Sequence, residues 1–168
     1  EIPFGAYYGS VDSTPLFVLL AGAYYTRTGD KDFMVSLWPH LEQAVAWIDQ
    51  YGDKDQDGFV EYFRQTPTRL AQQGWKDSFD SVFHADGTVA EGPIALCEVQ
   101  GYVYAAKLAA SKLAETLGYT QRASVHSEQA QALRDRFNRI FWSEELSTYI
   151  LALDGKKQPC AIRSTNAG

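Results

Sequence analysis

The sequence predicts a mainly α-helical fold built from pairs of helices, in which one helix is interior and the other exterior. Two segments, 14–28 and 94–117, are apolar on nearly every side, as is typical of a helix that is buried all round. Two others, 31–48 and 121–141, place apolar residues on one face and polar residues on the other. Pairs that alternate in this way can close into an α/α toroid, whose loops gather at one mouth. The two pairs in this chain are too few to close such a ring.

The first pair of helices has clear start and stop signals. Asp12 or Ser13 can cap the first helix, and Pro15 in its first turn tolerates the absence of an N–H group. This helix is expected to end at Gly29, after which Asp30 caps the second helix. The second helix carries an apolar stripe at spacings of three and four, formed by Phe33, Leu37, Leu41, Val45 and Ile48.

The segment between the two pairs is expected to hold short pieces of β-structure. A cluster of turn residues at 52–58 precedes a strand signal, FVEYF, at 59–63. Residues 82–89 predict a small hairpin that turns at Asp86 and Gly87.

The second pair of helices follows Pro93. Its interior helix has a long apolar stripe that consists of Leu96, Val99, Val103, Ala106, Ala110, Leu113 and Leu117. The exterior helix is expected to bury Ala130, Leu133, Phe137 and Ile140. A second hairpin then turns at Gly155 and ends near Ile162. Both interior helices have a proline near their start, Pro15 and Pro93, and carry a Gly-x-x-Tyr near mid-length, which is a weak internal repeat.

The composition limits the possible partners and locations. The chain has 168 residues, of which 45% are hydrophobic, and this is enough for a sizeable core. Its net charge of -6 argues against binding to nucleic acid. No apolar run reaches the roughly 18 residues that a membrane span needs, and no signal peptide opens the chain, so we expect a cytoplasmic protein with no membrane partner. Cys97 and Cys160 have no metal-ligand spacing and are expected to be buried thiols.

The run GWKDSFD, residues 74–80, carries the strongest functional signal, and we call it the motif loop. Sugar sites combine a flat ring that stacks on a pyranose with an acid that meets the glycosidic oxygen. Trp75 can supply the ring, although packing in the core is its alternative. An acid beside an apolar ring can keep a proton near neutral pH. Lys76 can bond sugar hydroxyls or lie in solvent. Asp77 is the candidate acid, with a loop carboxylate that caps a turn as its alternative; Asp80 is the rival acid, although holding the loop through backbone N–H groups is favoured for it.

Four segments give the chain a family resemblance: YYGSVDSTPLF, DQDGFVEY, QGWKDSFD and EGPIALCEVQGYVYAA, in this order. They resemble the catalytic domain of bacterial amylo-α-1,6-glucosidases, the glycogen-debranching-enzyme-like proteins, which belong with the glucoamylase and trehalase type of (α/α)6 glycoside hydrolases. The resemblance extends from about Phe4 to Gly168. It implies acid/base hydrolysis of α-glucosidic bonds in glycogen or oligosaccharides, with Asp77 as the general acid. The catalytic base of this group comes from much later in the toroid.

The resemblance also implies residues that bind the sugar. Asp12 follows the aromatic residue Tyr8, and an acid at such a helix start grips sugar hydroxyls in the wider group; a plain helix cap is the alternative. Glu98 and Gln100 lie in the opening turn of the third helix, where related hydrolases place an acid and an amide. A charged Glu98 on an interior helix is costly unless it is paired or lines a wet pocket, and we expect the pocket. Glu91 is a weaker candidate.

The ends of the chain suggest a fragment. The chain opens at Glu1, its only methionine is Met34, and it ends at Gly168 without a closing element. We expect residues 1–168 to form part of a single catalytic domain, with about two helical hairpins, inserted loops and no complete second domain. We therefore expect the isolated fragment to be inactive, since the base is missing, and able to self-associate through the exposed flanks of its inner helices.

Residues 53–58, DKDQDG, resemble the opening of a calcium loop, and we call them the acidic turn. The twelfth position of an EF-hand loop needs an acid, and here it holds Arg64. A rigid turn held by aspartate side chains is therefore favoured, with calcium as the alternative. The histidines His40, His84 and His126 show no ligand spacing, so no metal or cofactor is predicted. A non-catalytic carbohydrate-binding or scaffold module remains the alternative to an enzyme, and the resemblance can also report the fold alone.

Overall fold

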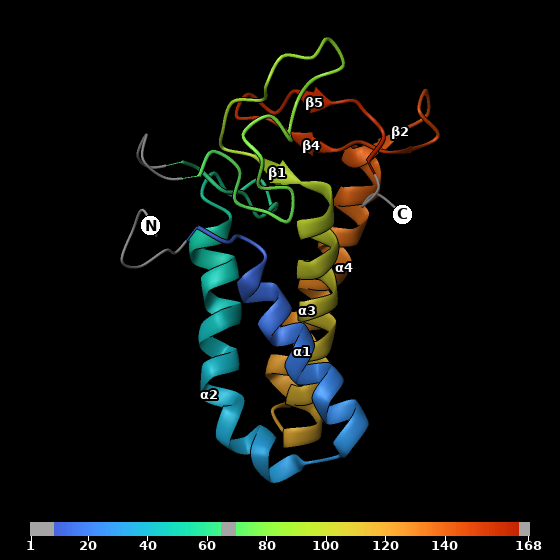
Figure 1. Ribbon diagram of the computed structural model, residues 1–168. Coiled ribbons are helices and arrows are strands. Elements are labelled where there is room, and N and C mark those ends of the chain that lie inside the picture. Colours follow the sequence, from blue (N-terminus) through green and yellow to red (C-terminus); the bar gives the residue numbers. More distant parts are fainter. Residues whose placement is uncertain (1–8, 65–69, 165–168) are drawn as a thin grey trace, which may run out of the picture.

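The computed structural model describes residues 9–64 and 70–164, which form a helical body with loops and short strands at one end (Figure 1). The helices are α1 (Ser13–Thr28), α2 (Lys31–Trp47), α3 (Cys97–Leu117) and α4 (Thr120–Phe141), and a π-helix, η1 (Ile48–Gly52), extends α2. α3 packs against both α1 and α4, and α2 packs against α1. The predicted mainly α class is confirmed. Closure into a toroid stays a prediction.

The start and stop signals of the first pair are largely confirmed. Gly29 ends α1 in the left-handed region at φ 67°, and Asp30 caps α2 by accepting a hydrogen bond from Phe33 N at 3.0 Å. The predicted capping role of Asp12 is wrong, although Asp12 does occupy the cap position. Its carboxylate accepts from Ser10 Oγ at 2.6 Å and makes no capping bond. Ser13 Oγ donates instead to the carbonyl of Ser10 at 3.0 Å.

The predicted burial of α1 on all sides is wrong for the part of the chain that the structure describes. Val18 and Ala21 are buried against α2 and α3. On the other side α1 exposes an apolar stripe, formed by Leu16, Phe17, Leu20 and Tyr24. Sequence hydropathy shows that a helix is apolar all round, but the neighbours that would cover it come from tertiary packing. Self-association through this stripe stays a prediction.

The inner helices α1 and α3 cross at close range. A Cβ atom added at Gly22 of α1 would lie 2.7 Å from Cβ of Ala109 on α3. Only glycine leaves room for this approach. Gly101, the matching glycine of the weak internal repeat, has open space instead, so the two repeats do not pack alike.

The apolar stripes of α2, α3 and α4 agree in part with the prediction. On α2 the buried residues are Met34, Trp38, Leu41 and Val45, whereas Phe33 is exposed. On α3 the predicted stripe is buried from Val99 to Leu113. On α4 Ala130 and Leu133 are buried as expected, but Ile140 is exposed. On α2 the predicted burial of Leu41, Val45 and Ile48 is confirmed. In the first half of the helix the buried stripe lies one position later than predicted, at Met34 and Trp38, a difference that a 3.6-residue period does not resolve.

The β-structure is sparser than predicted before α3 and richer after α4. β1 (Ala95–Leu96) pairs with β4 (Ala152–Leu153), which pairs with β5 (Pro159–Cys160), in one antiparallel sheet. β2 (Trp142–Ser143) pairs with β3 (Thr148–Tyr149). The hairpin that turns at Gly155 is therefore confirmed. The strand predicted at 59–63 is wrong, because this segment contributes only a bridge between Tyr62 and Ile94.

The smaller predicted hairpin forms a turn with one bridge. Phe83 pairs with Val89, and Gly87 adopts the left-handed φ of 87° that the turn requires. β1 takes the place of the first helical turn predicted after Pro93, so α3 begins at Cys97.

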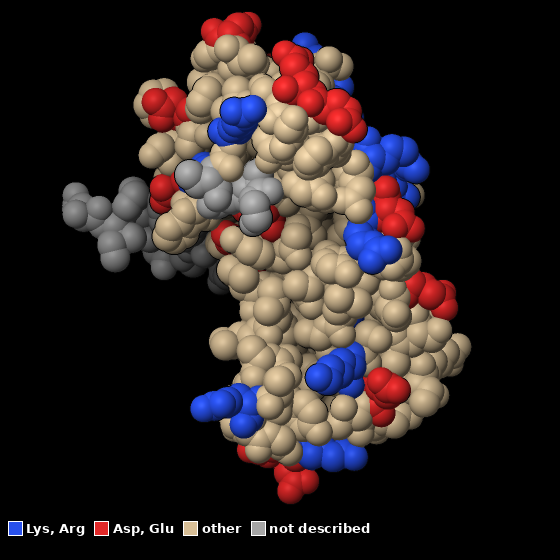
Figure 2. Space-filling view, turned by 90° about the vertical axis from the view of Figure 1, so that its right-hand side faces the viewer, with Lys and Arg blue, Asp and Glu red and all other residues tan. Residues whose placement is uncertain are grey.

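A second core joins the loops to the starts of the helices. Phe59, Val60 and Tyr62 pack with β1, β4 and the end of α4 in one buried cluster. Cys97 and Cys160 are free, buried thiols, and burial raises the pKa of each to about 12. None of the helices in the described ranges is long and apolar enough to cross a membrane. On the face shown in Figure 2, acidic and basic side chains alternate around a wide uncharged band.

Candidate functional site

The motif loop lies against the starts of α1 and α3. The N–H group of Val11 donates to the carbonyl of Gln73 at 2.9 Å, which joins the loop to the residues that precede α1. Gly74 approaches the side chain of Leu96 so closely that a Cβ atom would collide with it, which joins the loop to the residue before α3. The loop that carries the predicted acid and the two inner helix starts therefore meet at one place.

The motif loop presents its side chains to solvent. Trp75 is 73% exposed and Phe79 is 74% exposed, and Asp77 between them is exposed as well. The alternative of core packing for Trp75 is therefore wrong. Ser81 Oγ donates to the carbonyl of Lys76 at 2.7 Å, and Gln72 Nε2 donates to the carbonyl of Phe79 at 3.2 Å. These two bonds shape the backbone, while the aromatic rings stay available for a ligand.

Two acids lie beside this loop, at the starts of the helices. Glu98, in the first turn of α3, is only 6% exposed. Burial, and then the negative charges of Glu98 and Asp12, raise the pKa of Tyr102. Both carboxylates therefore lie close enough to act on one phenol. The predicted residues Asp12 and Glu98, at the starts of α1 and α3, thus both act electrostatically on Tyr102.

A second tyrosine connects Glu98 to the segment before the motif loop. The hydroxyl of Tyr62 donates to Gln72 Oε1, and Tyr62 is 5% exposed. Burial, followed by the charge of Glu98, raises the pKa of Tyr62. The phenol stays neutral and keeps its proton for this hydrogen bond.

Tyr62, Tyr102 and Phe79 were not predicted from the sequence as residues of the site. Tyr102 was accessible to prediction, because it follows Glu98 by four positions and so lies on the same helix face. Tyr62 and Phe79 lie in irregular segments without a period, so their sequence gives no comparable signal.

Two predicted sugar-binding residues fall outside this arrangement. Tyr8 lies outside the described residues. Gln100 is 1% exposed, and its amide bonds the backbone: Oε1 accepts from Val60 N at 2.9 Å, and Nε2 donates to the carbonyls of Val60 at 2.7 Å and Leu96 at 3.0 Å. The structure gives this amide a structural role in place of the predicted contact with sugar.

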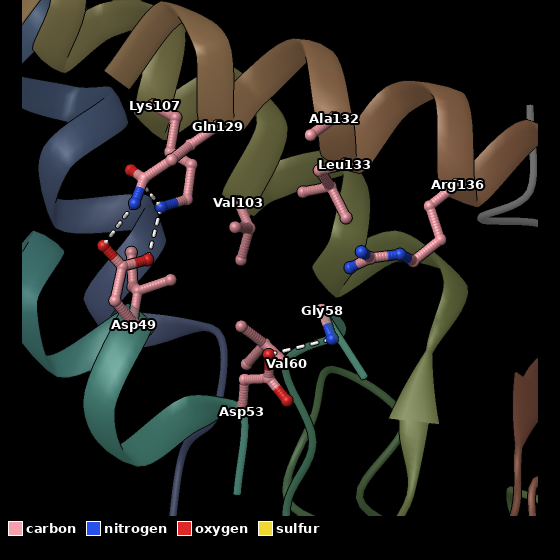
Figure 3. A pocket seen from close by; sticks show the side chains of 11 residues that line it. Asp49, Asp53, Gly58, Val60, Val103, Lys107, Gln129, Ala132, Leu133 and Arg136 are labelled. Atoms are coloured by element: carbon pink, nitrogen blue, oxygen red, sulfur yellow. Dashed lines mark hydrogen bonds and ion pairs between the residues drawn. The ribbon is translucent and has the colours of Figure 1, made fainter. Parts of the chain in front are cut away.

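A pocket of about 280 Å³ opens elsewhere, between η1, α3 and α4 (Figure 3). Lys107 forms an ion pair with Asp49 and donates to Gln129 Oε1 at 2.9 Å, and Gln129 Nε2 donates to Asp49 at 3.1 Å. Arg136 extends from α4 over Gly58. None of the predicted sugar-binding residues lines this pocket. The polar side chains of Asp49, Lys107 and Gln129 bond one another across this pocket, so we interpret them as a structural link between η1, α3 and α4.

The three histidines occupy different surroundings. His40 is exposed on α2, and His126 is buried on α4, where burial lowers its pKa. His84 Nε2 lies 3.4 Å from Asp154 Oδ2, between the two hairpins.

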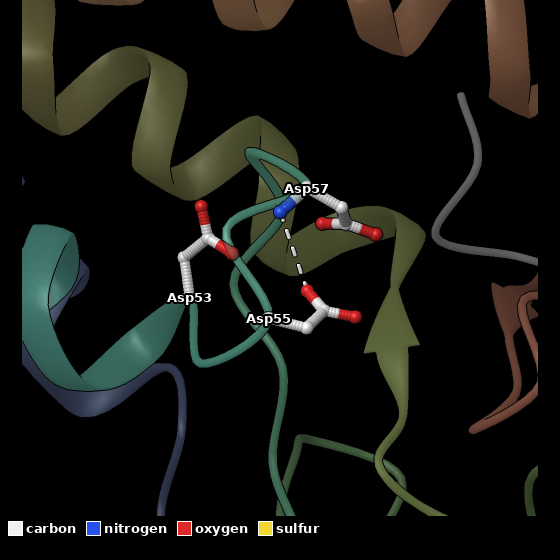
Figure 4. A group of neighbouring side chains, drawn as sticks. All are labelled: Asp53, Asp55 and Asp57. Carbon is white, nitrogen blue, oxygen red and sulfur yellow. Dashed lines mark hydrogen bonds between the residues drawn. The ribbon is translucent and has the colours of Figure 1, made fainter.

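The acidic turn is held by its own aspartates, as predicted. Asp53 Oδ2 accepts from Gly58 N at 2.8 Å, and Asp57 Oδ1 accepts from Phe59 N at 2.9 Å. Asp55 Oδ1 accepts from Asp57 N at 3.3 Å, the bond drawn in Figure 4. One carboxylate oxygen from each of the three aspartates lies within 4.8 Å of the others.

Comparison with known proteins identifies the family. Residues 9–167 match the family described as "Mannosylglycerate hydrolase MGH1-like glycoside hydrolase domain". A solved structure, the GH78 family rhamnosidase of Bacillus sp. GL1, is similar in fold, with a TM-score of 0.66 and 17% sequence identity. The similarity covers 92% of this chain but 14% of the rhamnosidase. No curated protein matches.

These matches confirm the predicted hydrolase type but not the narrower resemblance to amylo-α-1,6-glucosidases. The family match covers nearly the whole chain, from the residues before α1 to the last residues. The chain belongs to the MGH1-like glycoside hydrolase domain family.

Proposed function

We propose that this chain forms the part of a glycoside hydrolase active site that binds the sugar and supplies the general acid, Asp77. The observation that carries the proposal is the position of the motif loop. This loop meets the starts of α1 and α3, and it exposes Asp77 together with Trp75 and Phe79, which lie on either side of it in the sequence. Family membership supports the reaction type.

In this mechanism Asp77 donates its proton to the glycosidic oxygen while the bond between the anomeric carbon and that oxygen breaks. A second carboxylate removes a proton from a water molecule, whose oxygen attacks the anomeric carbon from the opposite face. An inverting pair needs roughly 6.5–9.5 Å between its carboxyl groups, which leaves room for the water. We propose that this base is supplied from outside the 168 residues, in keeping with a match that covers 14% of the rhamnosidase.

The surrounding residues suit recognition of a sugar. The rings of Trp75 and Phe79 offer apolar faces for the C–H groups of a pyranose. Asp12 and Glu98 can accept hydroxyl hydrogens, and a carboxylate accepts two at once. Lys76 and Tyr102 can donate to sugar oxygens.

We propose an α-glucosidic substrate of the debranching type first, because four ordered segments resemble amylo-α-1,6-glucosidases. A glycoside with an acidic aglycone is the second candidate. A pocket of about 250 Å³ beside the motif loop includes Lys76 and Arg163, whose charges suit a carboxylate such as that of mannosylglycerate.

The test uses the protein that carries this chain, with Asp77→Asn and the control Asp80→Asn. Each is assayed for hydrolysis of α-1,4- and α-1,6-glucosides, mannosylglycerate and a rhamnoside, and for binding of the best substrate. We expect Asp77→Asn to lower turnover by orders of magnitude but to retain binding. Hydrolysis that survives Asp77→Asn would show that another residue is the acid, and binding without turnover in the unmodified protein would favour the non-catalytic module.

A further inference from the structure

The acidic turn is in contact with a lysine about 100 positions away in the chain. The ammonium group of Lys157 lies 2.7 Å from Asp55 Oδ2, 2.7 Å from Asp57 Oδ2 and 2.9 Å from Glu61 Oε2. An ammonium group has three hydrogens, and here it meets three carboxylates. We propose that the acidic turn is a cation-binding turn whose cation is the ammonium group of Lys157.

Burial makes this arrangement energetically important. The side chain of Glu61 is only 1% exposed, and that of Lys157 is 32% exposed. A buried carboxylate is costly unless a positive charge or hydrogen bonds compensate for its lost hydration. Lys157 supplies that charge to Glu61 and at the same time reduces the repulsion between Asp55 and Asp57.

The electrostatics of the cluster agree with this geometry. Burial acts to lower the pKa of Lys157, but its hydrogen bonds to Asp55, Asp57 and Glu61 outweigh burial and raise that pKa above its ordinary value of 10.5. Burial raises the pKa of Glu61, with Lys157 opposing the change. The ammonium form is therefore the stable state of the lysine in this cluster.

The backbone on both sides positions the groups in advance. Lys157 and Gln56, which lies within the acidic turn, both have a backbone φ of 59°. Residues other than glycine rarely adopt this left-handed region. Asp154 holds the lysine's turn by accepting from the N–H groups of Lys156 at 2.8 Å and Gln158 at 2.7 Å. Two tight turns therefore present a cation and its ligands to each other.

This pairing explains how a calcium-like sequence can do without calcium. The aspartate oxygens are close enough to share an ion, and oxygen ligands are what Ca²⁺ prefers. The ammonium of Lys157 already contacts two of these aspartates and the buried Glu61. A divalent ion would have to displace it.

The experiment compares Lys157→Met with Lys156→Met. Lys156 is the exposed neighbour, so both variants lose one positive charge from the same turn. We expect Lys157→Met to lower the Tm by about 10 °C, because it leaves a buried carboxylate without its cation. We expect it also to gain Ca²⁺ binding, seen by calorimetry and as recovery of Tm in CaCl₂ relative to NaCl of equal ionic strength. The unmodified protein and Lys156→Met should show neither change.

Three results would overturn the proposal: stoichiometric Ca²⁺ binding by the unmodified protein, equal stability of the two variants, or a destabilised Lys157→Met that gains no Ca²⁺ affinity. Should Lys157→Met fail to fold, acetylation of the unmodified protein, followed by mass spectrometry, decides the question. We expect Lys157 to react at least about tenfold more slowly than Lys156, and equal rates would contradict its place in the cluster.

Discussion

The acidic turn and the motif loop lie at the same end of the molecule and contain similar residues, but their carboxylates are used differently. In the acidic turn, aspartates bond backbone N–H groups and the ammonium of Lys157. In the motif loop, Asp77 is exposed, as are Trp75 and Phe79 on either side of it in the sequence. Carboxylates committed to bonds stabilise a fold, whereas an exposed carboxylate beside aromatic rings is available to a ligand. Substitutions in the first segment should therefore change stability, and substitutions in the second should change activity.

The largest expected effect is that of Asp77→Asn. An amide cannot donate the proton that the leaving oxygen needs, so turnover should fall by about 10²–10⁴-fold. Because the side chain is exposed, the Tm should stay within about 2 °C of the unmodified value. Steady-state kinetics and thermal denaturation measure the two effects. A large loss of Tm would place Asp77 with the structural carboxylates and remove the contrast.

Gln100→Ala tests the segment that follows the acidic turn. The change removes three hydrogen bonds and leaves the buried N–H and carbonyl groups of Val60 unsatisfied, so unfolding free energy should fall by about 2–4 kcal/mol. Denaturant titration measures this loss. Substrate KM at a temperature where the variant is folded should stay within about twofold, and a larger rise would restore the sugar-binding role that the sequence predicted.

Trp75→Ala should weaken sugar binding by about tenfold, roughly 1.4 kcal/mol, through loss of a stacking face. The ring is 73% exposed, so unfolding free energy should change by less than about 0.5 kcal/mol. Calorimetric titration with the substrate identified for the protein measures the affinity, and Trp142→Ala, at another partly exposed tryptophan, is the control. Equal affinity in Trp75→Ala and the control would contradict stacking at Trp75.

The smallest effect is a change in the slope of stability against pH. The folded state raises the pKa of Lys157 above 10.5, so between the unfolded and folded pKa values the folded protein holds more protons than the unfolded chain. The contribution of Lys157 is complete below pH 10.5 and is lost as the pH rises further. Tm measured from pH 9 upward should fall less steeply in Lys157→Met than in Lys156→Met. Parallel curves of Tm against pH in the two variants would show that Lys157 has the same pKa in the folded and unfolded states.

Local signals in the sequence predicted the helices and their ends. Gly29 ends α1 and Asp30 caps α2 through contacts with residues no more than one helical turn away, so both can be predicted locally. The periodic spacing of apolar residues likewise identifies the four helices without knowledge of their neighbours. The missing strand at 59–63 shows the limit of this reasoning. Phe59, Val60 and Tyr62 are buried, but the side chain of Gln100 takes the backbone groups of Val60 that a strand partner would need.

The sequence predicted those residues of the candidate site whose chemical type suggests a role without knowledge of their neighbours. Trp75, Asp77 and Glu98 were identified from an aromatic–acid run and from a charge on an interior helix. The pairing of Lys157 with the acidic turn could not be predicted, because nearly 100 residues separate the partners and either is ordinary alone. Tyr102 could have been predicted from its spacing of four from Glu98, whereas the effect of Asp12 on its pKa depends on how α1 packs beside α3.

The contact between Gly22 and Ala109 has a consequence for the proposed sugar site. Any side chain at position 22 would push α1 away from α3. The two acids assigned to sugar hydroxyls lie at the upper ends of these same helices, some ten residues or about 15 Å from the contact. A methyl group there would widen the gap between the acids without touching either of them. In the proposed site, the separation of these two acids would thus depend on a position that contributes no side chain at all.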